Sequence, residues 1–272
     1  GPLSDRIGRR AVLKIAAALF TVSAIASAIA PDFITLVAAR MLGGFGVGAA
    51  LIIAPMYIAE LAPADIRGRM VSFNQLNIVI GISAAFFSNY LILGLAQSEL
   101  GWAQTLGMDT WTWRWMLGVE ALPAVFYFFA LYTVPESPRW LVMQGKDAAA
   151  LDIMAQVSGR AAAEAELAEV RQTLDAETRQ RQASLRELFH PTMKLVLTIG
   201  IVVAVLQQIT GINSVFFYAP MIFEQSGIGT DASFMQAVLV GLVNLVFTVL
   251  AILLIDRLGR RPLLGFGLAG IA

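Results

Sequence analysis

The sequence predicts an all-α protein that crosses a membrane several times, and three observations lead to this prediction. The 272 residues are 58% hydrophobic and 14% charged, with a mean hydropathy of +0.73, whereas charged residues usually make up about a quarter of a soluble domain. Several apolar stretches are long enough to cross a bilayer as a helix, which takes roughly 20 residues. They do not alternate in polarity as barrel strands do. The basic residues between them are distributed very unevenly.

Six complete apolar stretches are predicted to be membrane spans. In chain order they are residues 11–30, 34–59, 71–95, 113–134, 194–223 and 233–255, and a seventh begins near Pro262. Four of the five tryptophans lie around the gap before the fourth stretch, and Trp140 flanks its other end. Tryptophan is enriched at the membrane–water interface, so this placement supports the assignment of that span.

The basic residues predict the orientation of the spans. One set of alternate gaps holds 17 of the 19 Lys and Arg residues, and the other set holds only Arg40 and Arg114. The positive-inside rule places the first set in the cytoplasm. The hexapeptides DRIGRR (5–10) and DRLGRR (256–261) therefore lie on the same, cytoplasmic side. A motif that recurs in this way indicates two homologous halves, as in transporters built from two parallel repeats.

The segment from Glu136 to Lys194 differs in composition from the spans. It is rich in Ala, Glu, Arg and Gln, with apolar residues at helical spacing, which predicts short amphipathic helices on the cytoplasmic side. Ser137 before Pro138 suits an N-cap followed by proline at the first helical position, and Gly145 suits a stop signal. We interpret this segment as a helical connector between the two halves.

The sequence does not predict an enzyme. It contains no cysteine and a single histidine, His190, which precedes a proline at a predicted helix boundary and fits a capping or solvated residue. No Ser/His/Asp set, metal-ligand cluster or phosphate-binding loop is apparent. We therefore expect no cofactor, no bound metal and no nucleic-acid partner.

Four motifs resemble those of the sugar porter family of the major facilitator superfamily. They are G-x-x-x-D-x-x-G-R-R (1–10), PMYIAELAPADIRG (55–68), PESPRWL (135–141) and QQITGIN (207–213). Their order and spacing across essentially the whole chain make the set specific, and within the family the chain looks most similar to the bacterial D-xylose–proton symporter type. The resemblance implies twelve spans in two six-helix bundles, of which this chain supplies helices three to eight and the start of nine.

The same resemblance implies three domains. Residues 1–135 would belong to the N-terminal six-helix bundle, residues 136–193 would form a cytoplasmic helical linker, and residues 194–272 would belong to the C-terminal bundle.

The polar side chains inside the predicted spans are mostly neutral amides: Gln75 and Asn77 in the third, Gln207, Gln208 and Asn213 in the fifth, and Asn244 in the sixth.

These amides have two possible roles on spacing alone. Polar groups within a bilayer are unfavourable unless they pair or line a wet cavity. They could bond between helices, or they could bind the hydroxyls of a sugar, which match amide donors and acceptors without burying a charge. Gln207 and Asn213 do not share a face of an ideal helix, but a break at Gly211, or at Pro220, could bring both to one cavity.

The resemblance favours the sugar-binding role. It implies sugar contacts by Gln75, Gln207, Gln208, Asn213 and Asn244, with Ile78 as an apolar wall. Phe217 stands where the family often has a tyrosine, and Asn77 stands where a small residue is usual, so the preferred sugar stays open. Phe217 and its aromatic neighbours fit either a sugar's apolar face, an outer gate, or plain helix packing.

Charged residues in the cytoplasmic gaps predict a latch that closes when the site faces outward. Its candidate members are Asp5, Arg9, Arg10, Glu60, Arg67 and Glu136 from the first half and Asp256, Arg260 and Arg261 from the second. Exposed ion pairs contribute about 0–1 kcal/mol each, so only a network could bias the two states. Arginines that merely set topology would not need Asp and Gly at fixed spacing. Neutralising Glu60 or Arg67 should then favour the inward-facing state.

Arg40 is the candidate for proton coupling. It lies near the outer end of the second predicted span, before the small-residue run GGFGVGAA. The resemblance implies an acidic partner on helix one, which these residues do not include. An acid beside an arginine has a lowered pKa, so coupling would require the pair to separate during the cycle. Facilitators of the family also keep this arginine, so symport and uniport both stay open.

The function predicted is secondary transport of a pentose or hexose across the bacterial cytoplasmic membrane by alternating access, with proton symport, as a monomer. One alternative is a sugar or polyol uniporter of the same fold. Another is a membrane sensor that binds sugar without moving it. Counterflow of labelled sugar with and without a pH gradient separates symport from uniport.

Overall fold

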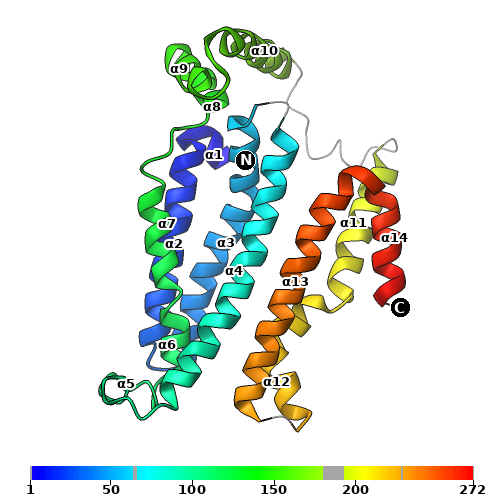
Figure 1. Ribbon diagram of the computed structural model, residues 1–272. Coiled ribbons are helices and arrows are strands. Elements are labelled where there is room, and N and C mark those ends of the chain that lie inside the picture. Colours follow the sequence, from blue (N-terminus) through cyan, green and yellow to red (C-terminus); the bar gives the residue numbers. More distant parts are fainter. Residues whose placement is uncertain (1, 64–65, 180–192, 228, 272) are drawn as a thin grey trace.

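The computed structural model describes residues 2–271 except 64–65, 180–192 and 228, and all its regular elements are helices (Figure 1). Their bounds are α1 Pro2–Ile7, α2 Arg9–Ile29, α3 Phe33–Leu61, α4 Arg67–Ala96, α5 Gly101–Thr105, α6 Thr112–Gly118, α7 Ala121–Ala130, α8 Pro138–Met143, α9 Asp147–Ser158, α10 Arg160–Arg179, α11 Lys194–Ile209, α12 Ile212–Gln225, α13 Thr230–Leu258 and α14 Arg260–Ile271. His190 lies outside the described residues.

Four helices are long and apolar enough to cross a membrane: α2, α3, α4 and α13. The shortest, α2, has 21 residues and is therefore about 31 Å long, which matches the thickness of a bilayer's hydrocarbon core. They confirm the first, second, third and sixth predicted spans. Helix α3 starts at an N-cap, where Asp32 accepts a 2.8 Å hydrogen bond from the Thr35 backbone N–H. The bonds from Thr35 lower the pKa of Asp32.

The fourth predicted span, 113–134, is wrong as one continuous helix. The chain forms α6 and α7 instead, separated at Val119 and Glu120. Pro123 explains the interruption, because it has no N–H to offer the Val119 carbonyl and its ring crowds that carbonyl. The Val119 carbonyl accepts from the Leu122 N–H at 3.1 Å, a tighter turn that ends the regular helix.

The fifth predicted span, 194–223, is also divided into two helices. Helix α11 ends at Ile209 and α12 starts at Ile212, with Gly211 between them at a φ of 73°. A break at Gly211 was one of the two that the sequence allowed. The other does not occur, because α12 continues through Pro220 to Gln225.

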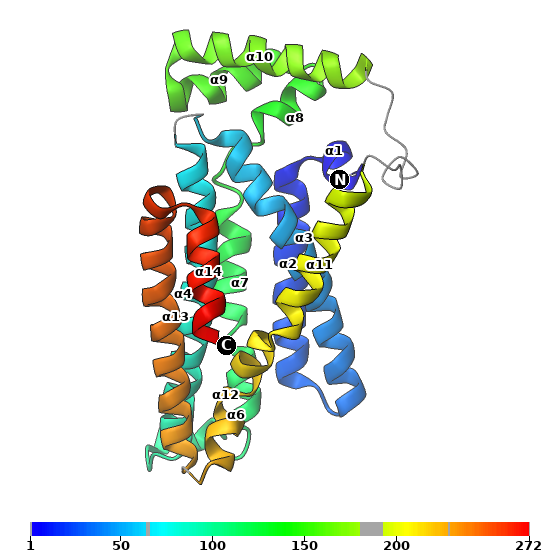
Figure 2. The ribbon, with the colours of Figure 1, turned by 90° about the vertical axis from the view of Figure 1, so that its right-hand side faces the viewer.

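The long helices form two groups, and one pair of helices forms most of the contact between them. The first helix group consists of α2, α3, α4, α6 and α7, with a core cluster that contains Leu13, Ala17, Ile53 and Leu131. The second helix group consists of α11 to α14. Helices α4 and α13 run side by side in both views and form the main contact between the groups (Figures 1 and 2).

Helices α8, α9 and α10 form a separate layer across one end of the first helix group (Figures 1 and 2). They have their own core, which contains Leu141, Ala150, Met154, Ala163 and Leu167. Helix α8 begins as the sequence predicts, with the Ser137 side chain accepting from the Trp140 N–H and with proline at its N-terminus. The positive-inside rule predicts that this end, the cytoplasmic end, faces the cytoplasm.

Helices α5 and α6 lie at the opposite end of the first helix group (Figure 1), and Trp102, Trp111, Trp113 and Trp115 lie in these two helices or at their ends. The Arg114 guanidinium lies 4.6 Å from the centre of the Trp111 ring and 4.8 Å from that of Trp113. Its two terminal nitrogens donate to the carbonyls of Ala28 and Ala30, at 3.3 and 2.8 Å, which lie at the C-terminal end of α2. One charged side chain thus satisfies carbonyls that the end of a helix leaves without partners.

Candidate functional site

A buried arginine organises the cytoplasmic end of the first helix group. Arg9 is only 3% exposed, and its guanidinium donates two hydrogen bonds to the Glu60 carboxylate, at 3.0 and 3.1 Å. Another nitrogen of the same guanidinium lies 3.0 Å from the Asp5 carboxylate and donates to the Ser4 carbonyl. A charge that leaves water needs such complete pairing, and the fork-shaped guanidinium fits a carboxylate with two parallel bonds.

Glu60 also connects the helix bundle to α8. The Ser137 hydroxyl donates to the Glu60 carboxylate while the same oxygen caps α8 by accepting from the Trp140 N–H. The Trp140 indole donates to the Asp5 carbonyl at 3.0 Å. The end of α3, the start of α8 and helix α1 are therefore held together by one hydrogen-bonded set.

Glu136 is held next to the first hexapeptide by backbone donors. Its carboxylate accepts from the backbone N–H groups of Arg10 and Ser137, both at 3.0 Å. Gly8 has a φ of +96°, and a Cβ placed there would lie 2.5 Å from a Glu136 oxygen. The glycine of the hexapeptide is thus required both by its backbone conformation and by the space that this carboxylate occupies.

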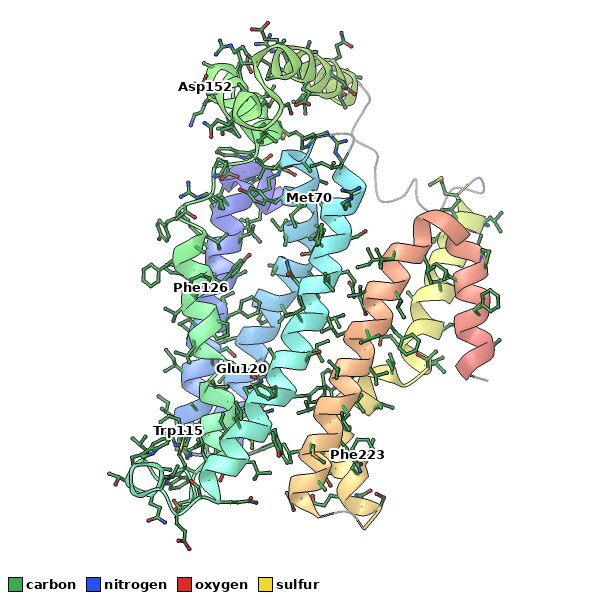
Figure 3. All side chains as sticks on the ribbon, viewed as in Figure 1. Met70, Trp115, Glu120, Phe126, Asp152 and Phe223 are labelled. Atoms are coloured by element: carbon green, nitrogen blue, oxygen red, sulfur yellow. The ribbon has the colours of Figure 1, made fainter. Side chains whose placement is uncertain are left out.

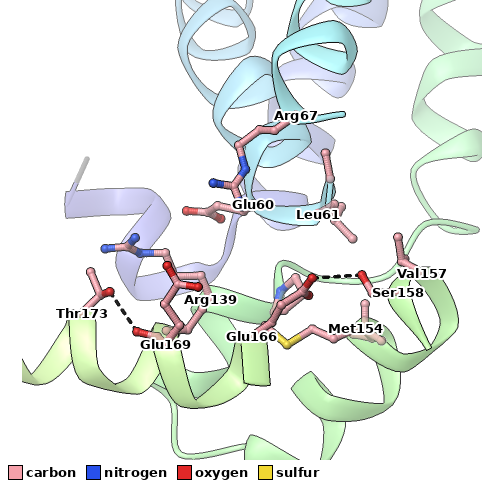
Figure 4. Close-up of a pocket in the computed structure, with 14 residues that line it drawn as sticks. Glu60, Leu61, Arg67, Arg139, Met154, Val157, Ser158, Glu166, Glu169 and Thr173 are labelled. Atoms are coloured by element: carbon pink, nitrogen blue, oxygen red, sulfur yellow. Dashed lines mark hydrogen bonds between the residues drawn. The ribbon is translucent and has the colours of Figure 1, made fainter. Parts of the chain in front are cut away.

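Arg10 and Arg67, which the sequence grouped in the latch, have different surroundings. The Arg10 guanidinium donates to the carbonyls of Leu131 and Tyr132, both at 2.7 Å, just after α7. Arg67, at the start of α4, lines a cavity of about 260 Å³ between the bundle and α8–α10, together with Glu60 and Arg139 (Figure 4). Helices α8–α10 form one wall of this cavity, and its lining contains both acidic and basic side chains.

The latch residues Asp5, Arg9, Glu60 and Glu136 lie close together in the structure. The bonds described above join these side chains to residues of the first half. The side chains of Asp256 and Arg260 lie outside the described residues, so their partners stay a prediction. The turn between α13 and α14, which carries the second hexapeptide, lies at the same end as α1 but apart from it in both views (Figures 1 and 2).

The amides of α4 and α13 lie on helix faces that are turned toward the other helices. Gln75 and Phe86 are three turns apart and differ by about 20° around α4. Phe86 stacks on Phe216 of α12 with ring centres 6.4 Å apart, so this face of α4 looks toward α12. Asn244 is half-buried and lies on the same face of α13 as Gly241, which contacts α4.

Two further amides meet across the helix break. The Asn213 side chain in the first turn of α12 donates to the Gln208 side-chain oxygen in the last turn of α11, at 2.9 Å. Phe217, one turn after Asn213, is 79% exposed. The side chain of Gln207 lies outside the described residues. The break at Gly211 therefore aligns Gln208 with Asn213, which an unbroken helix would place on different faces.

Ile78 and Asn77 differ in how they relate to this arrangement. Ile78 is half-buried and lies within about 60° of Gln75 around α4, whereas Asn77 lies about 200° away, on the opposite face. Helices α4, α12 and α13 contact one another. Gln75, Asn213 and Asn244 therefore lie on three helices that take part in the contact between the two groups, with Gln75 and Asn213 exposed and Asn244 half-buried.

Arg40 has a partner that the sequence reasoning missed. Its guanidinium forms a 2.8 Å ion pair with Glu120, at the interruption between α6 and α7, and both side chains are about half exposed. They line a cavity of about 470 Å³ together with Ser23, Gly43 and Tyr127 (Glu120 is labelled in Figure 3). An acidic residue in the middle of an apolar span was itself the signal that would have identified it.

Comparison with known proteins shows extensive similarity. The family described as sugar (and other) transporter matches residues 1–272. The chain is 42% identical over 272 residues to the arabinose-proton symporter of Bacillus subtilis, which covers all of this chain and 56% of that protein. It is 40% identical over 293 residues to the D-xylose-proton symporter of Escherichia coli K12, covering 57% of that protein.

The fold is similar to a solved structure of the E. coli xylose transporter in a partially occluded, inward-open conformation. The TM-score is 0.80 at 38% identity, and the match covers 97% of this chain and 59% of that one. The chain spans somewhat more than half the length of the curated relatives it matches.

The Arg9–Glu60 pair generates the first testable prediction. Arg9→Met leaves the Glu60 carboxylate buried without its cation, and we expect it to destabilise the protein by about 3–5 kcal/mol. Arg9→Met combined with Glu60→Met removes both charges and should restore most of this loss. Thermal unfolding of the purified protein, followed by its intrinsic tryptophan fluorescence, measures both effects.

Arg160→Met provides the matched control. Arg160 is 66% exposed and lies 3.6–3.7 Å from the carboxylates of Glu164 and Asp152, so its loss should cost at most about 1 kcal/mol. Equal destabilisation by the Arg9 and Arg160 variants would contradict the organising role of the buried pair.

Proposed function

The chain belongs to the sugar (and other) transporter family, and we propose that it forms part of a carrier that moves a monosaccharide across the bacterial cytoplasmic membrane by alternating access. The family is one of multi-pass membrane transporters rather than enzymes. The observation that carries the proposal is the placement of Gln75, Asn213 and Asn244 on three helices that contact one another. Neutral amides can bind several sugar hydroxyls without placing a charge in the membrane.

Residues 1–135 and 194–272 would act as parts of the two bundles that move relative to one another, and residues 136–193 would connect them. The helix break at Gly211 supports this role for the second part. Unwound or broken helices inside a transporter place backbone and side-chain groups next to a central site. In this chain the break aligns the Gln208 and Asn213 amides, which are 2.9 Å apart.

We propose a pentose or hexose as the substrate and a proton as the coupling ion. The two relatives compared above carry the names of an arabinose-proton and a D-xylose-proton symporter. The Arg40–Glu120 pair supports coupling, because it places a carboxylate beside a fixed positive charge within the spans. Uniport of a sugar or polyol is the alternative, and a sensor that binds without transport is another.

The latch is proposed in a modified form. The Arg9–Glu60 network forms one side of the latch and is assembled within the first half, and the second hexapeptide supplies the other side. The separation of the two hexapeptides agrees with the similarity of the chain to an inward-open structure, in which a cytoplasmic latch would be open. Glu60 holds α8 in place, so Arg67 is the residue whose neutralisation tests the latch most directly.

The transport proposal predicts exchange of labelled sugar across a membrane. Proteoliposomes that contain the complete protein and are loaded with unlabelled arabinose or D-xylose should take up the labelled sugar by counterflow. An imposed pH gradient should drive accumulation of sugar for a symporter and not for a uniporter. Glu120→Gln should keep counterflow and lose the accumulation. Saturable sugar binding without counterflow would favour the sensor.

The sugar-contact proposal predicts a specific pattern of affinities. Gln75→Ala and Asn244→Ala should each weaken sugar binding roughly tenfold, which is about 1.4 kcal/mol and typical of a lost hydrogen bond to a buried partner. Asn77→Ala, on the opposite face of α4, is the control and should leave the affinity unchanged. Titration calorimetry measures the Kd, and a lower melting temperature with an unchanged Kd would assign the amides to helix packing instead.

The latch proposal predicts a shift in state balance. Arg67→Gln should favour the inward-facing state and slow net uptake, because it weakens the network that closes the cytoplasmic side. Arg69→Gln, also in the first turn of α4, is the matched control. Spin-label distances between the cytoplasmic ends of α4 and α13, together with initial uptake rates, report both quantities. Identical behaviour of the two variants would argue against the latch.

A further inference from the structure

One polar contact between the two helix groups lies near the middle of α4 and α13. The Ser83 hydroxyl oxygen is 2.9 Å from the Gly241 carbonyl oxygen of α13 and 3.0 Å from the Val79 carbonyl oxygen of its own helix. A hydroxyl has a single proton, so it can donate to only one of these acceptors at a time. The bond can therefore pass from one carbonyl to the other when the two helices tilt, without leaving the hydroxyl unpaired.

Gly241 allows the two backbones to approach closely at this point. A Cβ at this position would lie 3.0 Å from a ring carbon of Phe86 and 3.2 Å from the Cα of Ser83. The Ser83 Cα is backbone and cannot rotate aside as the end of a side chain can. An added Cβ would therefore require Phe86 or the two helices to shift by a few tenths of an ångström. Gly81, on α4 two residues before Ser83, has no atom within 4 Å of such a Cβ.

The same level of α4 also contacts α12. Phe86 stacks on Phe216 with ring centres 6.4 Å apart and the ring planes inclined by 25°. Stacked rings can slide over one another with little change in contact area, so this pair tolerates a small rotation of the helices. Around Ser83, α4 thus meets two helices of the second group through contacts that permit rotation.

The position of the contact along the helices matters for the motion. Ser83 lies about 24 Å from the first residue of α4 and about 20 Å from its last residue. A rotation about a point near the middle of a helix moves its two ends in opposite directions. That is the displacement a carrier needs in order to open one side of the membrane while it closes the other.

We propose that the Ser83–Gly241 contact is the pivot about which the two helix groups rock. The inference rests on the proposed function, because rocking is required only if the protein alternates its access. The separation of α4 and α13 at this level stays constant through the cycle, while the separations at both ends change. Gly241 provides a surface without a side chain, and Ser83 keeps a hydrogen bond in either tilt.

Spin-label distances in the complete protein test this proposal directly. Residues 1–272 contain no cysteine, so pairs can be introduced after any cysteines elsewhere are replaced by serine. Exposed positions are available at three levels: Met70 with Leu254 at the cytoplasmic end, Ala84 with Leu242 beside the contact, and Leu91 with Met235 at the outer end.

Addition of D-xylose or arabinose in lipid nanodiscs, with pH varied, should shift the two end pairs in opposite directions. The Ala84/Leu242 pair should keep its distance distribution. A shift of the middle pair as large as that of the end pairs would overturn the pivot and leave the transport proposal intact. If no pair moves while the protein binds sugar, the transport proposal fails and the pivot fails with it.

Gly241→Ala gives an independent test. The added methyl must be accommodated against α4 while the helices rotate, and we expect kcat for uptake to fall roughly tenfold with a sugar Kd that changes less than twofold. Gly81→Ala should leave kcat unchanged. Phe86→Leu, which shortens the side chain nearest to the new methyl, should restore part of the rate in the Gly241→Ala background. A matching loss of rate in Gly81→Ala, or an unaffected Gly241→Ala protein, would contradict the assignment.

Discussion

The constraint on which the rest of this structure depends is the absence of water in the hydrocarbon core of a membrane. Backbone N–H and C=O groups must bond within their own helix there, which is why the spans are helices rather than open sheets or loops. Each polar side chain in a span must in turn find a partner or a wet space. Regular backbone hydrogen bonding within a helix is interrupted at the junction of α6 with α7 and at the junction of α11 with α12. Both carry polar groups: Glu120 at the first, and Gln208 with Asn213 at the second.

The cytoplasmic network follows from the same constraint at the membrane boundary. Arg9 is buried and therefore needs a full set of acceptors, which Glu60, Asp5 and the Ser4 carbonyl provide. Glu60 then binds Ser137, and Ser137 caps α8. In this way one buried charge determines where the connecting helices sit on the bundle. The charged side chains of the first hexapeptide therefore stabilise the packing of the first half, in addition to the contact with the second half that the latch proposal assigns to them.

A carrier needs rigid parts and a contact between them that permits motion. The network around Arg9 makes the first helix group and its cytoplasmic layer one connected body. The α4–α13 contact is of a different kind, with a glycine, a hydroxyl between two acceptors and a pair of stacked rings. Asn244 lies about one turn from Gly241 and Gln75 about two turns from Ser83, so a rotation at this contact would change the surroundings of both amides. Strong pairing inside one group and adaptable contacts between groups together suit a protein with two access states.

The sequence by itself determined the membrane-spanning helical class, four of the six complete spans as long helices, and the N-cap at Ser137, because apolar length and capping are local properties. Its basic-residue bias predicts the orientation. It also pointed to four residues of the first-half network: Asp5 and Arg9 through the recurring hexapeptide, and Glu60 and Glu136 as charged residues in the predicted cytoplasmic gaps. Only the tertiary structure decided that Arg9 pairs with Glu60 within one half, that Arg40 meets Glu120, and that Ser83 and Gly241 touch. These partners are 51, 80 and 158 positions apart in the chain. Composition and periodicity describe which face a residue occupies, whereas the identity of the residue opposite depends on how the helices pack.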